Sequence, residues 1–205
     1  MNKIVLIAVI AVVVLIAIVV AVPLILEHGV SSGGNFITPS EAASVIGGTW
    51  SIEEGQSFYF TTVNGNNVVT VKYFNGTTVT KPLSALLSSS GMLGSSYIPT
   101  SGMVESLEGT VNNESSSIGA FSLTFSSSTA AKDFYSNIQA ESTFFATQTQ
   151  NVSSNVFVFY GPGGNSGREF LSGIIELNGN TVYLVVVTAP MPLGSATLEN
   201  LVSYM

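Results

Sequence analysis

The longest uninterrupted apolar run in the sequence lies at its N-terminus. From Ile4 to Leu26 no side chain is charged or strongly polar, and Lys3 and Glu27 flank the run. As a helix rising about 1.5 Å per residue, the run would extend roughly 34 Å, which is enough to cross a hydrocarbon core of about 30 Å. The sequence therefore predicts a transmembrane signal-anchor helix at residues 1–27.

The charges that flank this run predict how the chain is oriented. The positively charged end of an anchor normally stays in the cytoplasm, so we expect the C-terminal part outside the membrane. Two alternatives stay open, a cleaved signal peptide and the leader of a filament subunit. The apolar stretch of a signal peptide is usually about 7–15 residues, shorter than this one. We therefore expect an uncleaved anchor, a linker at residues 28–36 and an extracytoplasmic domain at residues 37–205.

The polar part of the sequence is unusually poor in charge. Charged residues make up 8% of the chain, against about 25% in a typical soluble domain. The formal net charge is −7, and Asp133 is the only aspartate. A surface with so few basic groups does not become densely cationic when its carboxylates protonate. We hypothesise an acid-stable domain in an acidic external medium; the alternative is an ordinary surface protein with an uncharged polar coat.

Several kinds of chemistry lack the residues they need. There is no cysteine, so disulfides, thiol catalysis and cysteine-based metal sites are excluded. His28 is the only histidine and lies at the expected membrane boundary, which excludes a Ser-His-Asp triad or a multi-histidine metal site within the domain. The lack of a basic patch argues against nucleic acid as a partner. The sequence predicts no cofactor, no metal and no catalytic residue.

The remaining candidates for chemistry are carboxylates and one glycine-rich segment. Glu53 and Glu54 are adjacent, and Glu105 and Glu108 are three positions apart, so each pair points to opposite faces of an extended chain. We interpret all four as solvated surface charges. Residues 161–167 contain four glycines, as phosphate-binding loops do, but they lie between two predicted strands, which favours a hairpin loop.

Apolar periodicity and turn residues predict a β-rich domain. A capping threonine, a proline at the first helical position and a glutamate three residues after the cap occur together at Thr38–Glu41, where they begin a helix. The expected fold class is α+β, a mainly antiparallel sheet with about three helices. The expected strands cover residues 57–63, 67–74, 77–81, 103–111, 117–125, 155–160, 168–177 and 181–187, and the expected helices cover 39–46, 128–142 and a C-terminal segment capped by Ser195.

Three N-x-S/T sequons occur in predicted turns or loops. Their acceptors are Asn75, Asn113 and Asn151. A turn is where an acceptor must lie to reach the transferase, and all three fall on the side expected to be external. We predict N-glycosylation at one or more of them.

A serine- and glycine-rich stretch at residues 84–102 carries four large apolar side chains, Met92, Leu93, Tyr97 and Ile98. Either these side chains pack back into the domain, or the stretch is a loop that docks a partner, because a long apolar loop usually covers something. Both interpretations stay open.

The whole chain resembles the membrane-anchored surface proteins of thermoacidophilic archaea in composition. The Val/Ile/Ala-rich anchor, the lack of cysteine, the single aspartate and the Ser/Thr/Asn-rich outer part with its sequons carry the resemblance. It implies a cell-envelope setting and N-glycosylation, and it transfers no functional residue.

These features predict a non-enzymatic, membrane-anchored envelope protein whose outer domain binds a protein partner, as an accessory subunit or surface component. One alternative is an extracytoplasmic module that binds small molecules or glycans, with Trp50, Tyr59, Tyr73 or Tyr97 as stacking platforms. Another is a filament or pilus-like subunit that uses the apolar N-terminus as its polymer core. An enzyme that uses carboxylates in acid ranks last.

Overall fold

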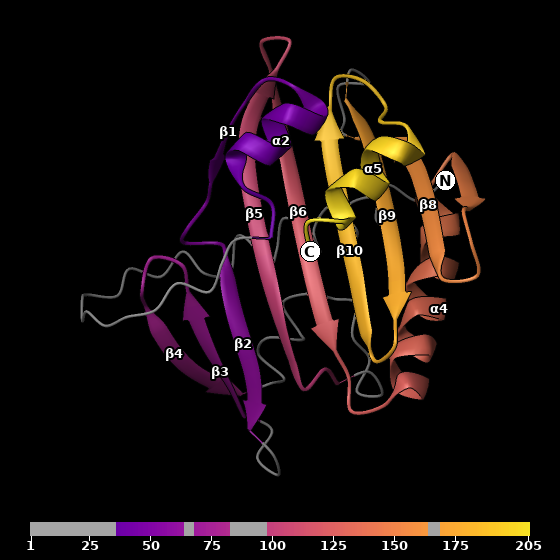
Figure 1. Cartoon of the computed structure of the whole chain (residues 1–205). Helices are drawn as coiled ribbons and strands as arrows, with labels where there is room; N and C mark the ends of the chain where they lie inside the picture. The colour runs from indigo at the N-terminus through magenta and orange to yellow at the C-terminus, as the bar shows by residue number, and fades with distance from the viewer. Residues whose placement is uncertain (1–35, 64–67, 83–97, 164–168) are drawn as a thin grey trace.

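The computed structural model describes residues 36–63, 68–82, 98–163 and 169–205 (Figure 1). The predicted anchor at residues 1–27 and nearly all of the predicted linker lie outside these ranges, so both stay predictions. Within the described ranges, no helix is long and apolar enough to cross a membrane.

The described strands form a single antiparallel sheet, as the sequence predicts. Along the sheet the order is β4-β3-β2-β5-β6-β10-β9-β8-β7, and β1 pairs with β5 beside this path. The bounds are β1 Thr49–Ile52, β2 Phe58–Val63, β3 Val68–Tyr73, β4 Thr78–Pro82, β5 Ser101–Val111, β6 Glu114–Thr124, β7 Gln148–Asn151, β8 Val156–Pro162, β9 Phe170–Asn178 and β10 Thr181–Ala189.

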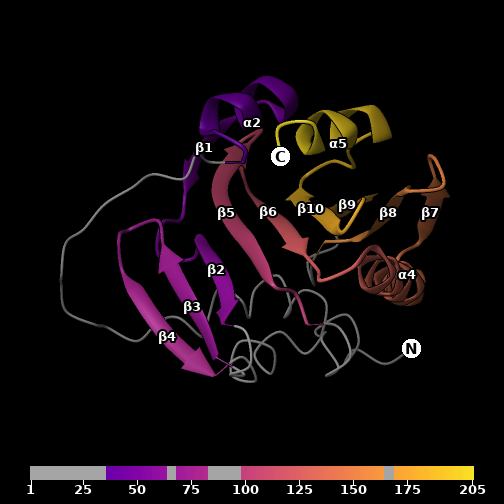
Figure 2. The ribbon, with the colours of Figure 1, turned by 60° about the horizontal axis from the view of Figure 1, so that its bottom comes forward.

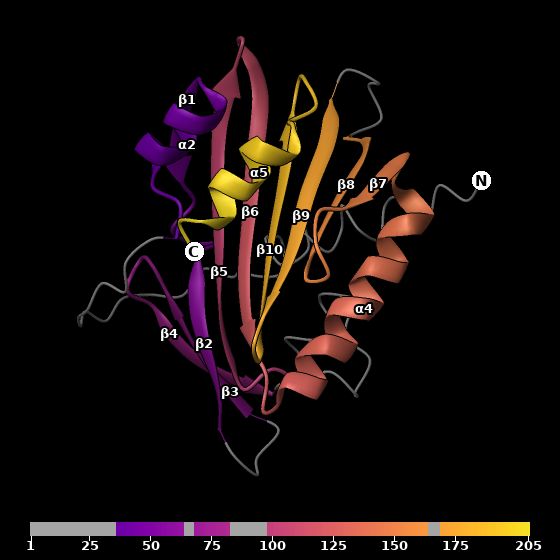
Figure 3. The ribbon, with the colours of Figure 1, turned by 45° about the vertical axis from the view of Figure 1, so that its right-hand side comes forward.

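Helices cover both faces of the sheet. Those described are α2 (Pro39–Ile46), α4 (Ser128–Phe145) and α5 (Ser195–Val202). Figures 1 and 2 show α2 and α5 together on one face, and Figure 3 shows α4 running along the other face beside β8 and β9. The predicted α+β architecture with about three helices is confirmed for this part of the chain.

Side chains alternate between two apolar cores because neighbouring residues of a strand point to opposite faces. One core joins the sheet to α2 and α5 and contains Ile37, Ile46, Leu107, Ile118, Ile174, Val185, Leu198 and Leu201, among others. The other joins the sheet to α4 and contains Phe58, Phe121, Phe134, Ile138, Phe159 and Ile175, among others. Each large side chain buried in this way contributes about 1.5–3 kcal/mol relative to exposure.

The helix α2 begins at the capping box that the sequence predicts. The Glu41 backbone N–H donates to Thr38 Oγ1 at 3.2 Å, and the Thr38 backbone N–H donates to Glu41 Oε2 at 2.7 Å. Pro39 occupies the first helical position, and Gly47, with a φ of 90°, ends the helix. These bonds satisfy amide groups that have no partner inside the helix.

The hairpin turns follow from their residues. Asn112 and Asn113 both have positive φ, at 53° and 63°, in the short turn between β5 and β6. Asparagine tolerates this conformation, which matches the twist of the flanking strands. Gly179, with a φ of 61°, turns the chain from β9 to β10. The predicted turn at residues 64–66 lies outside the described ranges.

The structure adds two strands that the sequence does not predict and corrects one predicted helix cap. The strands β1 (Thr49–Ile52) and β7 (Gln148–Asn151) were not predicted, because both are short and β7 has no apolar residue. The sequence predicts Ser195 as the cap of the last helix, but the cap is Gly194, which makes no side-chain capping bond. Ser195 is the first helical residue instead.

Candidate functional site

The three sequon asparagines are all exposed. Asn75 lies in the turn between β3 and β4, where its Oδ1 accepts a hydrogen bond from the Thr77 backbone N–H at 3.0 Å. Asn113 lies in the turn between β5 and β6. Asn151 ends β7, and its Oδ1 accepts from Gln139 Nε2 at 2.8 Å. Each acceptor is therefore open to solvent, and glycosylation stays a prediction.

The candidate partner-docking loop falls mostly outside the described residues. Met92, Leu93 and Tyr97 lie in the range 83–97, which the structure does not describe. Ile98 is described and is 40% exposed, directly before the buried Pro99. Ile98 is thus accessible at one end of the stretch.

The interpretation of Glu105 as a solvated surface charge is wrong. Glu105 is 0% exposed, whereas Glu108 on the same strand is exposed. The two do point to opposite faces of β5, as expected from their spacing, so they do not form a carboxylate pair. Burial is the main reason that the pKa of Glu105 is raised, to about 7.

The proposed stacking aromatics do not form a common platform in the described part of the chain. Tyr73 is 5% exposed and packs edge-on against Phe58 in the core, with ring centroids 5.4 Å apart. Trp50 is half-buried, and its Nε1–H donates to the Gly47 carbonyl at 2.8 Å. Tyr59 stacks on Phe74, with ring centroids 5.2 Å apart. Tyr97 lies outside the described residues.

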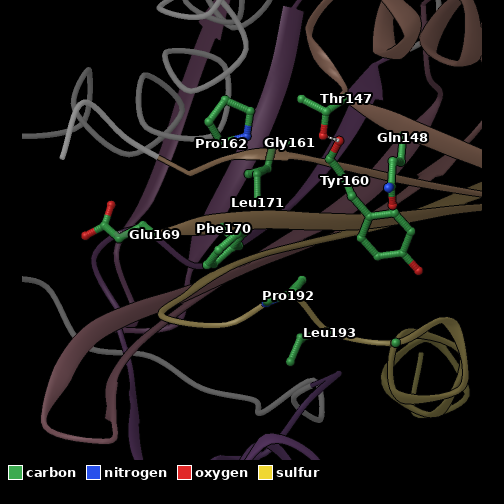
Figure 4. A pocket seen from close by; sticks show the side chains of 11 residues that line it. Thr147, Gln148, Tyr160, Gly161, Pro162, Glu169, Phe170, Leu171, Pro192 and Leu193 are labelled. Carbon is green, nitrogen blue, oxygen red and sulfur yellow. Dashed lines mark hydrogen bonds between the residues drawn. The ribbon is translucent and has the colours of Figure 1, made fainter. Parts of the chain in front are cut away.

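A groove that sequence reasoning did not find lies between the β7–β8–β9 end of the sheet and the connection from β10 to α5 (Figure 4). Its volume is about 660 Å³, and it is lined by Thr147, Gln148, Tyr160, Gly161, Pro162, Glu169, Phe170, Leu171, Pro192, Leu193 and Gly194. Most of these side chains are apolar. We call it the β8–α5 groove.

The strand side of the β8–α5 groove is aromatic. Tyr160 on β8 and Phe170 on β9 lie on the side of the sheet that faces Pro192 and Leu193 (Figure 4). Phe170 is 40% exposed, and Met191, directly before Pro192, is 41% exposed. Two large apolar side chains are therefore accessible at this place.

The other wall of the groove is held by a buried hydroxyl. Ser172 on β9 is 1% exposed, and its Oγ accepts a hydrogen bond from the Leu193 backbone N–H at 3.0 Å. Leu193 is itself 5% exposed and belongs to the core that joins α2, α5 and the sheet. The connection from β10 to α5 is thus fixed against the strand that supplies Phe170.

Polar groups lie at the ends of the groove rather than along it. Figure 4 shows Glu169 and Gln148 at opposite ends. The Thr147 hydroxyl donates to the Tyr160 carbonyl at 3.2 Å, so it is already used. The pKa of the Tyr160 phenol is raised, mainly by burial and to a smaller extent by the nearby charge of Glu199. The phenol is therefore neutral. Among the described residues that line the groove, Glu169 is the only one with a carboxylate.

This arrangement is suited to binding. In the described ranges no three His, Cys, Asp or Glu side chains gather where they would hold a metal ion. The β8–α5 groove offers apolar contact area, one acidic end and a fixed wall. The sequence does carry a signal for it, the run Ala189-Pro-Met-Pro-Leu193, because prolines and exposed apolar residues after a strand mark a rigid, accessible connection.

The glycine-rich segment follows β8 and precedes β9, which pair as antiparallel neighbours, as predicted, although Gly161 and Pro162 belong to β8 itself. Pro162 pairs with Phe170 in antiparallel register, and the Gly163 backbone N–H donates to the Glu169 carbonyl at 2.8 Å. Neither flanking element is a helix, so the arrangement of a phosphate-binding loop is absent here. Residues 164–168 lie outside the described ranges.

Comparisons with known proteins show a likeness of fold. No family model matches the sequence, and no curated protein matches it. Among solved structures, the chain is similar to the extracellular domain of PknH from Mycobacterium tuberculosis. The TM-score is 0.54 at 11% sequence identity, and the match covers 82% of this chain and 91% of that one. At this identity the match shows a shared fold.

Proposed function

We propose that this chain is a non-enzymatic, membrane-anchored protein of the cell envelope whose outer domain binds a segment of a protein partner in the β8–α5 groove. The observation that carries the proposal is the groove itself. It is apolar, one of its walls is fixed, and it has the exposed side chain of Phe170 in its lining and that of Met191 next to it in the chain. Exposed apolar side chains gathered at one place are typical of interaction sites.

The lining of the groove indicates what the partner segment looks like. Apolar side chains of the segment would contact Phe170 and Pro192, and a basic side chain would meet Glu169 at one end. The net charge of −7 favours a basic partner through long-range attraction. A partner segment of this kind would bury an aromatic anchor at its centre, as the energetically important residues of interfaces do.

One prediction from the sequence and one likeness of fold support a place outside the membrane. The predicted anchor orients the domain outward through Lys3. The solved structure with a similar fold is an extracellular domain. The compositional resemblance to archaeal surface proteins agrees with this setting and stays a prediction.

A photo-crosslinking amino acid placed at position 170 of the full chain, in its native membrane, tests the proposal. We expect one discrete crosslinked product whose partner segment contains apolar residues and a basic one. The same group at Tyr204, which is also 40% exposed but lies beyond the other end of α5, is the matched control and is expected to give none. No product at position 170, or the same product at both positions, contradicts the proposal.

A second candidate function is the binding of a small molecule or glycan in the same groove. Its volume of about 660 Å³ lies within the range of ligand pockets, about 300–1,000 Å³. Thermal-shift measurements against sugars and peptides separate the two functions. A rise in the unfolding temperature with sugars that Phe170→Ser abolishes would favour this candidate. Shifts with apolar basic peptides alone would favour the first.

A further inference from the structure

A buried carboxyl group lies where the N-terminal part of the chain joins the domain. Glu105 is in the middle of β5 and is 0% exposed. Its neighbours on the same face of the strand, Met103 and Leu107, are 4% and 0% exposed. An acidic side chain thus occupies a position whose strand neighbours are apolar.

Glu105 holds the first described residues of the domain through their backbone. Its Oε2 accepts a hydrogen bond from the Ile37 backbone N–H at 2.8 Å, and Ile37 is itself 0% exposed. The Phe36 backbone, one residue earlier, also acts on the carboxyl group and lowers its pKa. Residues 36 and 37 directly precede α2, whose capping box begins at Thr38. The carboxyl group therefore joins this junction to the centre of the sheet.

The other oxygen of the same group differs from Oε2 in its surroundings. Glu105 Oε1 is buried and has no hydrogen-bond partner among the described residues. A buried carboxylate needs several hydrogen bonds or a cation to offset the loss of its hydration. A neutral carboxyl group tolerates this environment at much lower cost. The geometry alone thus favours the protonated form.

The ionisable groups that face Glu105 strengthen this preference. On α2, the charge of Glu41 disfavours ionisation of Glu105. On β2, the phenol of Tyr59 has a raised pKa, first through burial and then through the charge of Glu105. On β6, the residue paired with Glu105 is Ala120, which does not ionise. None of these three groups is a cation. The cation Lys72 on β3 lies on the same face, opposite Tyr59, and β2 separates its strand from β5.

We propose that Glu105 is a pH-dependent latch that holds the N-terminal junction and α2, residues 36–46, against the sheet in acid and lets this segment open as the pH rises to neutrality. The segment opens because water then reaches the carboxylate and hydrates it. This inference goes beyond partner binding, and it places a pH response at the point where the predicted linker meets the domain.

The pKa of Glu105 determines how the stability of the closed form changes with pH. Burial raises the pKa of Glu105 to about 7, and the charge of Glu41 adds to this, whereas the backbone groups of Ile37 and Phe36 lower it. When the segment is open and water reaches the carboxyl group, its pKa returns toward the ordinary value of 4.5. The closed form is thus most stable, relative to the open form, below pH 4.5. This stability falls as the pH rises from 4.5 to about 7, and above pH 7 it changes little.

Hydrogen exchange on the full chain in detergent micelles tests the latch. Amides of residues 36–46 are compared with amides of β9 and β10 at pH 5 and 7.5, after correction for the intrinsic pH dependence of exchange. We expect the opening of residues 36–46 to increase about tenfold or more at the higher pH. The amides of β9 and β10 are expected to change far less.

Two variants identify the responsible group. In Glu105→Gln the side chain is neutral at both pH values and still accepts the Ile37 N–H, so the opening is expected to stay constant within about twofold. In Glu108→Gln, which changes an exposed carboxylate on the opposite face of the same strand, the wild-type response is expected to remain.

Three results would overturn the latch. They are a wild-type opening of residues 36–46 that does not depend on pH, an equal increase throughout the sheet, and a response that persists in Glu105→Gln. If Glu105→Gln does not fold, the comparison of segments within the wild type and within Glu108→Gln still decides.

Discussion

At the scale of single residues, two buried polar side chains set where chain segments meet the sheet. Glu105 accepts from the Ile37 backbone, and Ser172 accepts from the Leu193 backbone. Both lie on the face that α2 and α5 cover. A backbone amide that is buried needs such an acceptor, because an unsatisfied one costs about 1–3 kcal/mol.

The bond from Leu193 to Ser172 gives the first prediction at this scale. Ser172→Ala leaves the buried Leu193 N–H without this acceptor, so we expect the free energy of unfolding to fall by about 1–3 kcal/mol. Ser154→Ala, at an exposed position between β7 and β8 and outside any sequon, is the control and should change it by less than about 0.5 kcal/mol. Urea denaturation of both variants measures the difference, and equal values would contradict the role given to Ser172.

The sequence contained a signal for Glu105 that was misinterpreted. A glutamate is usually exposed, so the surface interpretation followed the common case. Met103, Glu105 and Leu107 alternate along one predicted strand, however, which places the glutamate on the apolar face. Its partner Ile37 is distant in sequence, and no local pattern indicates that contact.

At the scale of elements, strong local signals predicted what the structure shows and weak ones did not. The capping box predicted α2 to the residue, and apolar alternation predicted the long strands β5, β6, β9 and β10. The strand β7 is wholly exposed, so it carries no alternation to detect. The β8–α5 groove was missed because it forms between β8, β9 and a connection that are distant in sequence.

The turns give a prediction about modification. Asn75, Asn113 and Asn151 are exposed at turns or at a strand end. We expect protein from its native source to exceed its polypeptide mass of 21.4 kDa, and Asn113→Gln to remove one glycan. Asn155→Gln, which changes an exposed asparagine outside any sequon, is the control. A mass equal to that of the polypeptide, measured by intact mass spectrometry, would contradict glycosylation.

At the scale of the whole molecule, the shortage of charge and the buried Glu105 act in the same direction. The few basic residues limit charge repulsion in acid, because protonated carboxylates leave little net positive charge. The raised pKa of Glu105 favours the folded state as the pH falls from about 7 to 4.5. Both properties suit an acidic medium.

This gives a prediction for thermal unfolding of the full chain. We expect the unfolding temperature to rise between pH 7.5 and 4.5 and to hold at pH 3. The rise is expected to vanish in Glu105→Gln, because its side chain does not ionise. Calorimetry at each pH measures this, and a midpoint that collapses below pH 3 would end the hypothesis of an acid-stable domain.

The binding of a protein partner in the β8–α5 groove is the central proposal for this protein. The most direct test is to extract the full chain from native membranes in mild detergent and to measure the mass of the complex that contains it. We predict a stoichiometric complex that Phe170→Ser weakens about tenfold or more and Tyr204→Ser leaves intact. A lone monomer, or a complex that both variants retain equally, would contradict the claim.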